Sequence, residues 1–437
     1  MNKPKILIWS DFVAPTGFAN VAKNLFDELH KKFHVSIVGI NYHGDRKYDT
    51  EKYFVYSVSR DDMLGIKRLP AIIKRENPDV LLLFQDIFYI ADHIEKFKKE
   101  LSSTAKVIIY FPVDGAPFSQ AWKGTFKHAN AIITYSDWAI KTIRETIDIP
   151  QEIFKLYHGV DTNIFKPLKM ENIKQIRKSL SWTNKFVAIN INRFQPRKAV
   201  PLSARAFSLF AKGYKLCRCG NHMPLNRVSC DLNMCSVKDI IEVIKHNRKD
   251  VFYYLHMMPQ EASMGPGRAN LLQNHLLNAG FDDDDANTIL GMNTANIYNQ
   301  EVSEGQLNEL YNASNLNISS TLGEGCGLSL LESAATGTPS IAPRNSAIPE
   351  VLNGTGTLIN NSNLMNQALD NGHLRPVVNI WEMALAWEKE YQKWKNSDQE
   401  VIIDQDCLNN INDNFMWQDK RDLLHKIIEN TMNGKRE

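Results

Sequence analysis

The stretch that most constrains this chain is a run of small and polar residues at positions 319–339, SSTLGEGCGLSLLESAATGTP. The short apolar run that begins at Leu316 predicts a buried strand just before it. Three glycines at alternate positions then allow the backbone to approach a ligand closely. From Leu328 the apolar residues recur with helical spacing, until a Gly-Thr-Pro sequence ends the pattern. The stretch therefore predicts a strand, a glycine-rich loop and a helix.

Two carboxylates in this stretch, Glu324 and Glu332, are separated by seven residues. If the helix begins near Gly327, Glu332 lies roughly one and a half turns into it. The N–H groups and the positive dipole end of such a helix suit a phosphate. Glu324 would then accept hydrogen bonds from sugar hydroxyls, and Glu332 from a ribose. The alternative is a capped surface helix with two solvated carboxylates, but the glycines and the terminal Gly-Thr-Pro favour a ligand site.

The composition is that of an ordinary globular protein. With 437 residues, 43% of them hydrophobic and 23% charged, the chain is long enough for two or three domains. Its net charge of +2 is too balanced to indicate a nucleic acid or a membrane as partner. The N-terminus enters a strand without a secretory hydrophobic region, and apolar runs such as residues 80–84 are shorter than a transmembrane helix. We therefore expect a cytoplasmic protein without transmembrane segments, in which thiols stay reduced.

Strand patterns alternate with helical patterns along most of the chain, which indicates an α/β protein with parallel, doubly wound sheets. The predicted strands of the first half lie at residues 5–10, 35–40, 79–84, 106–110 and 131–135. A second unit of the same kind opens with a strand at 185–191. In such sheets ligands bind at the carboxyl ends of the strands, so the residues that follow each strand are the candidate site residues.

The Glu-Gly-Cys-Gly-Leu…Leu-Glu-Ser-Ala…Gly-Thr-Pro pattern resembles the signature of retaining glycosyltransferases of the GT-B fold, group 1 or family four. The resemblance covers nearly the whole chain except one cysteine-rich insertion. It implies two Rossmann-like domains that face a central cleft. The N-terminal acceptor domain would span residues 1–158, completed by a C-terminal helix at 413–437, and the donor domain would span 159–412.

The resemblance also implies a reaction: a sugar moves from a nucleotide-diphosphate sugar, expected to be a UDP-sugar, to an acceptor hydroxyl with retention of configuration. In the family an Arg and a Lys after the first strand of the donor domain contact the diphosphate. Arg193 and Lys198 match these places, with Arg197 as a rival for Lys198. Two fixed cations would stabilise the charge that grows on the leaving group without a catalytic metal. The alternative is that these are surface basic residues at a strand end.

The resemblance supplies the remaining site residues. Asp114 stands near the point where many family members place a histidine, and it joins Glu324, Arg193 and Lys198 in the expected catalytic set. The alternative for Asp114 is an Asp-Gly turn residue. Gly17 matches the N-terminal glycine loop that faces the donor diphosphate. The full set of expected donor-binding residues is Gly17, Glu332, Gly325, Cys326, Gly327 and Leu328.

Four of the six cysteines fall in an insertion at residues 214–249 of the donor domain. Close pairs of thiolates are typical ligands of a structural zinc ion. We expect Cys217, Cys219, Cys230 and Cys235 to hold one zinc, with His222 as a substitute ligand. The alternative is a cluster of ordinary reduced thiols.

Two other polar features are interpreted as structural. His158 stands in a stretch that resembles the family's linker between the domains, and we expect it to make hydrogen bonds there. The acidic run at 282–285 follows no predicted strand, so a solvated loop is favoured over a metal site.

Two rival functions remain open for this chain. A nucleotide-sugar epimerase shares the fold but needs no acceptor, and a non-catalytic nucleotide-sugar-binding protein would have lost the cations or Glu324. The acceptor is a glycan, a protein or a modified DNA base. The last is included because Asp114 and the cysteine insertion resemble glycosyltransferases from large DNA viruses or phages.

Overall fold

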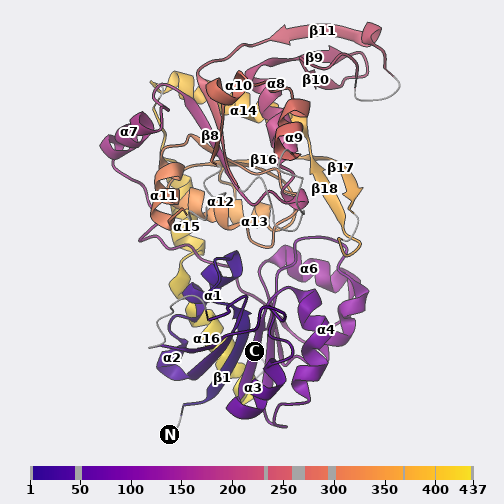
Figure 1. Cartoon of the computed structure of the whole chain (residues 1–437), viewed down its shortest axis with the longest axis vertical. Coiled ribbons are helices and arrows are strands. Elements are labelled where there is room, and N and C mark those ends of the chain that lie inside the picture. The colour runs from indigo at the N-terminus through magenta and orange to yellow at the C-terminus, as the bar shows by residue number, and fades with distance from the viewer. Residues whose placement is uncertain are drawn as a thin grey trace. The chain divides into compact units, whose positions relative to one another are not determined.

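The computed structural model describes residues 3–44, 52–230, 235–257, 271–293, 302–367, 370–398 and 400–434. The chain divides into two compact units (Figure 1). Unit 1 comprises Met1–Gly159, Asn366–Leu374 and Phe415–Glu437, and unit 2 comprises Val160–Met365 and Arg375–Asn414. Each unit is built around a parallel sheet with helices on its faces, as the alternating patterns predict.

The sheet of unit 1 has seven parallel strands in the order β3-β2-β1-β4-β5-β6-β7. Its central strands are continuous runs of buried apolar residues, because helices cover both faces of a parallel sheet. The strands are β1 Lys5–Asp11, β2 His34–Ile40, β3 Phe54–Tyr56, β4 Val80–Phe84, β5 Lys106–Tyr110, β6 Ala131–Thr134 and β7 Ile153–Lys155.

Two helices of unit 1, α1 and α6, begin at polar residues that cap their first turn. Thr16 accepts a hydrogen bond from the N–H of Ala19 at the start of α1, and Ser136 accepts one from Ala139 at the start of α6, both at 3.1 Å. The helices are α1 Gly17–Phe26, α2 Leu29–Lys32, α3 Leu69–Glu76, α4 Ile87–Lys98, α5 Lys123–Phe126, α6 Asp137–Thr146 and α16 Trp417–Asn433.

His158 lies inside unit 1 and does not do what the sequence suggested. Its ring packs within 6.5 Å of the rings of Phe84, Tyr110, Tyr135 and Trp417. Within the part of the chain that the structure describes, neither ring nitrogen has a hydrogen-bond partner. Burial lowers the pKa of His158 to about 3, so the ring is neutral. The expectation of a hydrogen-bonding linker residue is therefore wrong, because three strands and α16 surround this position with aromatic side chains.

The sheet of unit 2 has six parallel strands in the order β13-β12-β8-β14-β15-β16. Aromatic rings fill its core, with the centroids of Phe207 and Trp387 at 4.9 Å and those of Tyr253 and Trp387 at 5.2 Å. The strands are β8 Phe186–Ile191, β12 Val251–His256, β13 Leu290–Asn293, β14 Leu316–Ile318, β15 Ser340–Pro343 and β16 Thr357–Ile359. The helices are α7 Met170–Ser179, α8 Val200–Ala211, α9 Leu271–Ala279, α10 Asp285–Thr288, α11 Glu304–Asn312, α12 Leu328–Ala335, α13 Ile348–Leu352, α14 Ile380–Asn396 and α15 Gln405–Asn414.

Two small sheets are added to this framework. β17 (Asn361–Asn366) and β18 (Leu374–Val378) form a two-stranded sheet. The cysteine-rich insertion forms a three-stranded sheet in the order β10-β9-β11. Its strands are β9 Gly213–Cys217, β10 His222–Pro224 and β11 Ile240–Lys245. The insertion follows the C-terminal end of α8 and precedes β12, so it joins the parallel sheet at the amino end of a strand (Figure 1).

We predict that Gly159→Ala destabilises unit 1. An added Cβ would lie 2.7 Å from Cδ2 of Trp417 and 2.9 Å from its backbone nitrogen, so α16 would have to shift. Overpacking of this kind costs about 1–3 kcal/mol in the free energy of unfolding, which urea denaturation would measure. Gly124→Ala on α5 is the matched control, because its added Cβ meets nothing within 4 Å. Equal stability of the two variants would contradict the prediction.

Candidate functional site

The site in unit 2 lies where the strand order changes direction. From β8 the chain continues to β12 on one side of the sheet, and it later returns to β14 on the other side of β8. In open α/β sheets, ligands bind outside the carboxyl ends of the strands at such a switch point. Three loops leave the sheet here: residues 192–199 after β8, 319–327 after β14 and 344–347 after β15.

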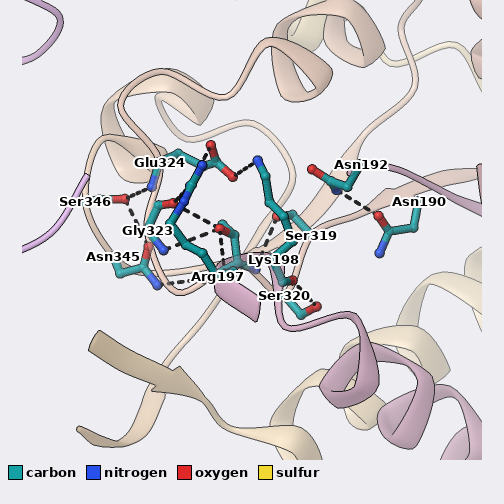
Figure 2. Close-up of polar contacts among 11 residues, drawn as sticks. Asn190, Asn192, Arg197, Lys198, Ser319, Ser320, Gly323, Glu324, Asn345 and Ser346 are labelled. Atoms are coloured by element: carbon teal, nitrogen blue, oxygen red, sulfur yellow. Dashed lines mark hydrogen bonds and ion pairs between the residues drawn. The ribbon is translucent and has the colours of Figure 1, made fainter. Parts of the chain in front are cut away.

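A buried carboxylate joins the first two of these loops. Lys198 places its Nζ 2.5 Å from Oε1 of Glu324, and Nη1 of Arg197 lies 3.3 Å from Oε2 (Figure 2). Glu324 is only 7% exposed. Burial alone would raise the pKa of Glu324, but the charges of Lys198 and Arg197 outweigh it and bring the pKa to about 2. Glu324 is therefore ionised at any physiological pH.

Hydrogen bonds to the backbone fix the two loops against each other. The guanidinium of Arg197 donates to the carbonyl of Gly323, and the N–H of Leu322 donates to the carbonyl of Arg197 at 2.8 Å. The hydroxyl of Ser320 donates to the carbonyl of Ala199 at 3.0 Å. Ala199 has φ +46°, a left-handed conformation that is costly for a residue with a Cβ. These contacts hold the residue that immediately precedes α8 in this conformation.

The third loop, residues 344–347 after β15, makes hydrogen bonds to the loop that carries Glu324. Ser346 accepts a hydrogen bond from the N–H of Glu324 at 2.8 Å and donates one to Oδ1 of Asn345 at 3.0 Å. Nδ2 of Asn345 in turn donates to the carbonyl of Thr321 at 3.1 Å (Figure 2). Ser346 also has a left-handed backbone, with φ +47°. The loops after β8, β14 and β15 therefore form one hydrogen-bonded unit.

The predicted helix after the glycine loop is α12, which begins at Leu328. Gly327 is its N-cap and has φ +87°, a conformation that favours glycine. No side chain in the described part of the structure caps the first turn of α12, so its N-terminus offers its amide groups and dipole to an anion. Gly325 and the buried Cys326 complete the loop between Glu324 and this helix.

Glu332 lies on the second turn of α12, as predicted, and has a different environment from Glu324. The hydroxyl of Tyr311 on α11 donates to Oε2 of Glu332 at 3.1 Å. Burial raises the pKa of Glu332 to about 7, although the hydrogen bond from Tyr311 works in the opposite direction. Glu332 is therefore near its midpoint of ionisation at neutral pH.

The remaining predicted site residues lie outside this cluster. Arg193 follows β8 by two residues and has an exposed side chain. Gly17 is the first residue of α1, and Asp114 follows β5 by four residues; both belong to unit 1. The roles expected for these three residues stay predictions.

Sequence reasoning missed several polar residues at strand ends. In unit 1 the buried carboxylate of Asp11, at the end of β1, accepts hydrogen bonds from Asn41 at 2.9 Å and Gln85 at 3.0 Å. Burial raises the pKa of Asp11. In unit 2 the missed residues are Asn345 and Ser346. All of them lie at the carboxyl end of a strand or within three residues after it, so the rule that ligand sites follow parallel strands would have found them.

The acidic run at 282–285 is a solvated loop in its first three residues, as expected, because Asp282, Asp283 and Asp284 are exposed; Asp285, at the start of α10, is buried. Lys212, the residue after α8, places its Nζ 3.1 Å from Asp282 and 2.5 Å from Asp285, which is 8% exposed. Because these carboxylates neutralise a lysine that the fold brings to them, they form an ion-pair cluster at the C-terminal end of α8.

The four predicted metal ligands do come together. The sulfur atoms of Cys217, Cys219, Cys230 and Cys235 all lie within 4.8 Å of one another. The substitute ligand His222 is not part of this group among the described residues. Its ring stacks on Trp381 of α14, with the centroids 3.6 Å apart and the planes at 5°. The expectation for His222 is therefore corrected, because β10 presents its ring to α14.

Comparison with known proteins identifies the fold and finds a family match over part of the chain. The model of the family Glycosyl transferases group 1 matches residues 243–371. Sucrose-phosphate synthase from Thermosynechococcus elongatus superposes with a TM-score of 0.68 at 12% identity, covering 99% of this chain and 100% of that chain. A glycosyltransferase from Rickettsia africae gives 0.65 at 15% identity, covering 99% of both chains. HepE of Anabaena, solved with UDP and glucose, gives 0.64 at 12% identity, covering 98% of this chain and 99% of that chain. No curated protein sequence matches the chain significantly.

The chain is a glycosyltransferase of the GT-B fold. Residues 243–371, which match the model of the family Glycosyl transferases group 1, include the glycine loop, α12 and both glutamates. The fold and the enzyme class predicted from the sequence are therefore confirmed, and the predicted resemblance to group 1 glycosyltransferases is confirmed over residues 243–371. Among the described residues, the structure contains no helix that is long and apolar enough to span a membrane.

We predict that Glu332→Gln stabilises the protein more at pH 8 than at pH 5. The folded state raises the pKa of Glu332 from 4.5 to about 7, so the folded state binds more protons than the unfolded state between these values. The contribution of this group to the free energy of unfolding therefore falls as the pH rises through that window. Because Gln does not ionise, the variant does not lose this contribution to the free energy of unfolding as the pH rises. Thermal unfolding at both pH values would measure the difference.

The matched control for this prediction is Glu309→Gln on the exposed side of α11, which removes a carboxylate from the neighbouring helix. A melting-temperature difference between wild type and Glu332→Gln that is the same at pH 5 and pH 8 would contradict the prediction.

Proposed function

We propose that this glycosyltransferase moves a sugar from a nucleotide-diphosphate sugar, with UDP as the nucleotide, to an acceptor hydroxyl with retention of anomeric configuration. The observation that carries the proposal is the buried Glu324 held between Lys198 and Arg197 beside the N-terminus of α12. This arrangement places two cations, a helix dipole and an ionised carboxylate at the switch point of one sheet. The complex of HepE with UDP and glucose supports the nucleotide.

We assign the donor contacts by chemical type. The diphosphate is proposed to bind Arg193, Lys198 and the N-terminus of α12 at Gly327 and Leu328, since all of these favour an anion. Glu324 accepts hydrogen bonds from sugar hydroxyls. The ribose hydroxyls are assigned to Glu332. Gly325 and Cys326 shape the loop, and Gly17 is assigned to the diphosphate from the N-terminal domain.

The ion pair at Glu324 supports an electrostatic role for this carboxylate. With a pKa of about 2, Glu324 is a poor proton acceptor, and two cations occupy its oxygens. We therefore propose attack on the same face from which the leaving group departs. The bond from the sugar C1 to the diphosphate oxygen breaks, the acceptor oxygen bonds to C1 on that face, and the acceptor proton moves to the departing phosphate oxygen. Lys198 and Arg193 stabilise the negative charge that grows on the diphosphate.

The proposed transfer needs no divalent metal, since its charge stabilisation comes from side chains and a helix N-terminus. The zinc ion that we propose for the cysteine-rich insertion is structural and takes no part in the transfer.

The acceptor is proposed to bind the N-terminal domain, residues 1–158 with the C-terminal helix, while residues 159–412 hold the donor. Asp114 is assigned to a hydroxyl of the acceptor or of the transferred sugar, because it follows a strand of the parallel sheet in unit 1. The acceptor classes are a glycan, a protein and a modified DNA base.

We predict that Lys198→Ala lowers turnover on the order of 10²-fold, the usual effect of removing one preorganised charge stabiliser. The variant also leaves Glu324 with Arg197 as its remaining cation at the site. Steady-state kinetics on the transfer reaction would measure the loss. Lys212→Ala is the matched control, since this lysine also pairs with carboxylates but lies at the opposite end of α8. Equal turnover of the two variants would remove Lys198 from the proposed mechanism.

We predict that a donor screen detects sugar transfer from a UDP-sugar and that the product keeps the anomeric configuration of the donor. Mass spectrometry of reactions with and without a glycan, a protein or a DNA acceptor identifies the pair, and proton NMR of the product reads the anomeric configuration. A free epimerised sugar without acceptor would support the epimerase instead. An inverted product would refute the attack on the leaving-group face.

A further inference from the structure

The insertion brings four sulfur atoms from three places in the chain to one point. Cys217 ends β9 and Cys219 lies in the turn that follows, Cys230 comes after β10, and Cys235 lies just before β11 and its short preceding helix. All four sulfurs lie within 4.8 Å of one another, and those of Cys219 and Cys230 are 3.7 Å apart. Three separate segments of the insertion therefore direct their cysteine side chains to the same point.

These separations match a metal site and do not match a disulfide. Zinc binds four thiolates tetrahedrally with Zn–S bonds of about 2.3 Å, which puts neighbouring sulfurs about 3.8 Å apart. A disulfide requires about 2.05 Å between its sulfurs. None of the six cysteines, all of which are described, forms a disulfide. The 3.7 Å between Cys219 and Cys230 is therefore too long for a disulfide bond and fits two ligands of one ion.

We propose that Cys217, Cys219, Cys230 and Cys235 bind one zinc ion in a closed, structural site. Four sulfur ligands fill the tetrahedral coordination of zinc and leave no position for a substrate or a reactive water. The only other common ion for such a set is iron, so the metal itself has to be measured.

The turns around the sulfurs are built to hold them. Gly220 has φ +86°, and its N–H donates to the carbonyl of Cys217 at 2.8 Å. The N–H of Cys217 donates to the carbonyl of Asn221 at 3.0 Å. Nδ2 of Asn221 lies 3.4 Å from the sulfur of Cys230, so an amide donor faces a ligand atom. Hydrogen bonds of this kind orient metal ligands and offset the charge of thiolates.

The sheet of the insertion has only a small apolar core of its own. The buried apolar cluster of its sheet consists of Cys217, Met223 and Cys230, with Cys235 and Ile240 partly buried against it. Other large apolar side chains of the insertion, Val228, Ile241 and Val243, are at least half exposed. Since a core made mainly of sulfur atoms buries little hydrocarbon, metal binding has to supply the free energy that orders these strands.

The proposed zinc site also lies away from the loop after β8, which is proposed to bind the donor diphosphate. The insertion leaves α8 at its C-terminal end, whereas Lys198 precedes its N-terminal end, and a helix of 12 residues is about 18 Å long. Contacts of the insertion go to the helices of unit 2: His222 stacks on Trp381 of α14, and Nδ2 of Asn226 donates to the carbonyl of Leu277 on α9 at 3.1 Å. Loss of the metal should release the insertion and leave the donor site intact.

The test uses the full chain, purified without chelators, with metal content measured by inductively coupled plasma mass spectrometry. We expect about one zinc per chain, as a single closed site requires. The double variant Cys230→Ser/Cys235→Ser should contain none. Hydrogen exchange should become fast in β9 and β11 of this variant, while β8 and β12 stay protected and UDP binding is unchanged. Cys407→Ala is the matched control, a buried cysteine on α15 that should keep both the zinc and the protection.

Three results would overturn the proposal: wild-type protein without metal whose four thiols react with a thiol reagent, iron in place of zinc, or zinc retained by the double variant. The metal content of the wild type decides the first two even if the double variant fails to fold. Because metal content and hydrogen exchange are read without any transfer reaction, a failure of the proposed function leaves this test unaffected.

Discussion

The geometry of the site in unit 2 depends on one buried carboxylate and its two cations. Glu324 lies at the switch point of unit 2, where it contacts Lys198 and Arg197 from a loop more than a hundred residues earlier in the chain. Because a buried carboxylate without partners would be costly, this contact fixes the loop after β8 against the loop after β14. The hydrogen bond from the N–H of Glu324 to Ser346 extends the same constraint to the loop after β15.

The two glutamates of the glycine-loop signature have opposite electrostatics although they stand eight positions apart. The pKa of Glu324 falls to about 2 beside two cations, and the pKa of Glu332 rises to about 7 in a site where the partner is the neutral hydroxyl of Tyr311. Because Glu324 is always charged, it provides a constant electrostatic field at the proposed position of the sugar. A group near its midpoint responds to its surroundings, and a ribose hydroxyl that donates to it would favour its charged form.

Local patterns predicted the strand, the loop and α12, because their signals lie within about twenty adjacent residues: apolar spacing, glycines and a terminal proline. The parallel sheets followed from the alternation of strands and helices, and the cysteine cluster followed from residue type and spacing. What sequence reasoning missed depends on strand order. The contact of Arg197 with Glu324 requires β8 and β14 to be neighbours, and that of Lys212 with Asp285 requires α8 to end beside α10. The aromatic surroundings of His158 come from three strands and a helix, so no local pattern could show that it would lack hydrogen bonds.

The antiparallel pairing of β9 with β11 places Gly213 opposite Lys245, so the chain enters and leaves the cysteine-rich insertion at nearly the same point. A segment with adjacent ends can be lengthened, shortened or exchanged between related proteins while the helix before it and the strand after it keep their register. The position between α8 and β12 can therefore hold an added module while the parallel sheet beneath the loop of Glu324 keeps its strand order.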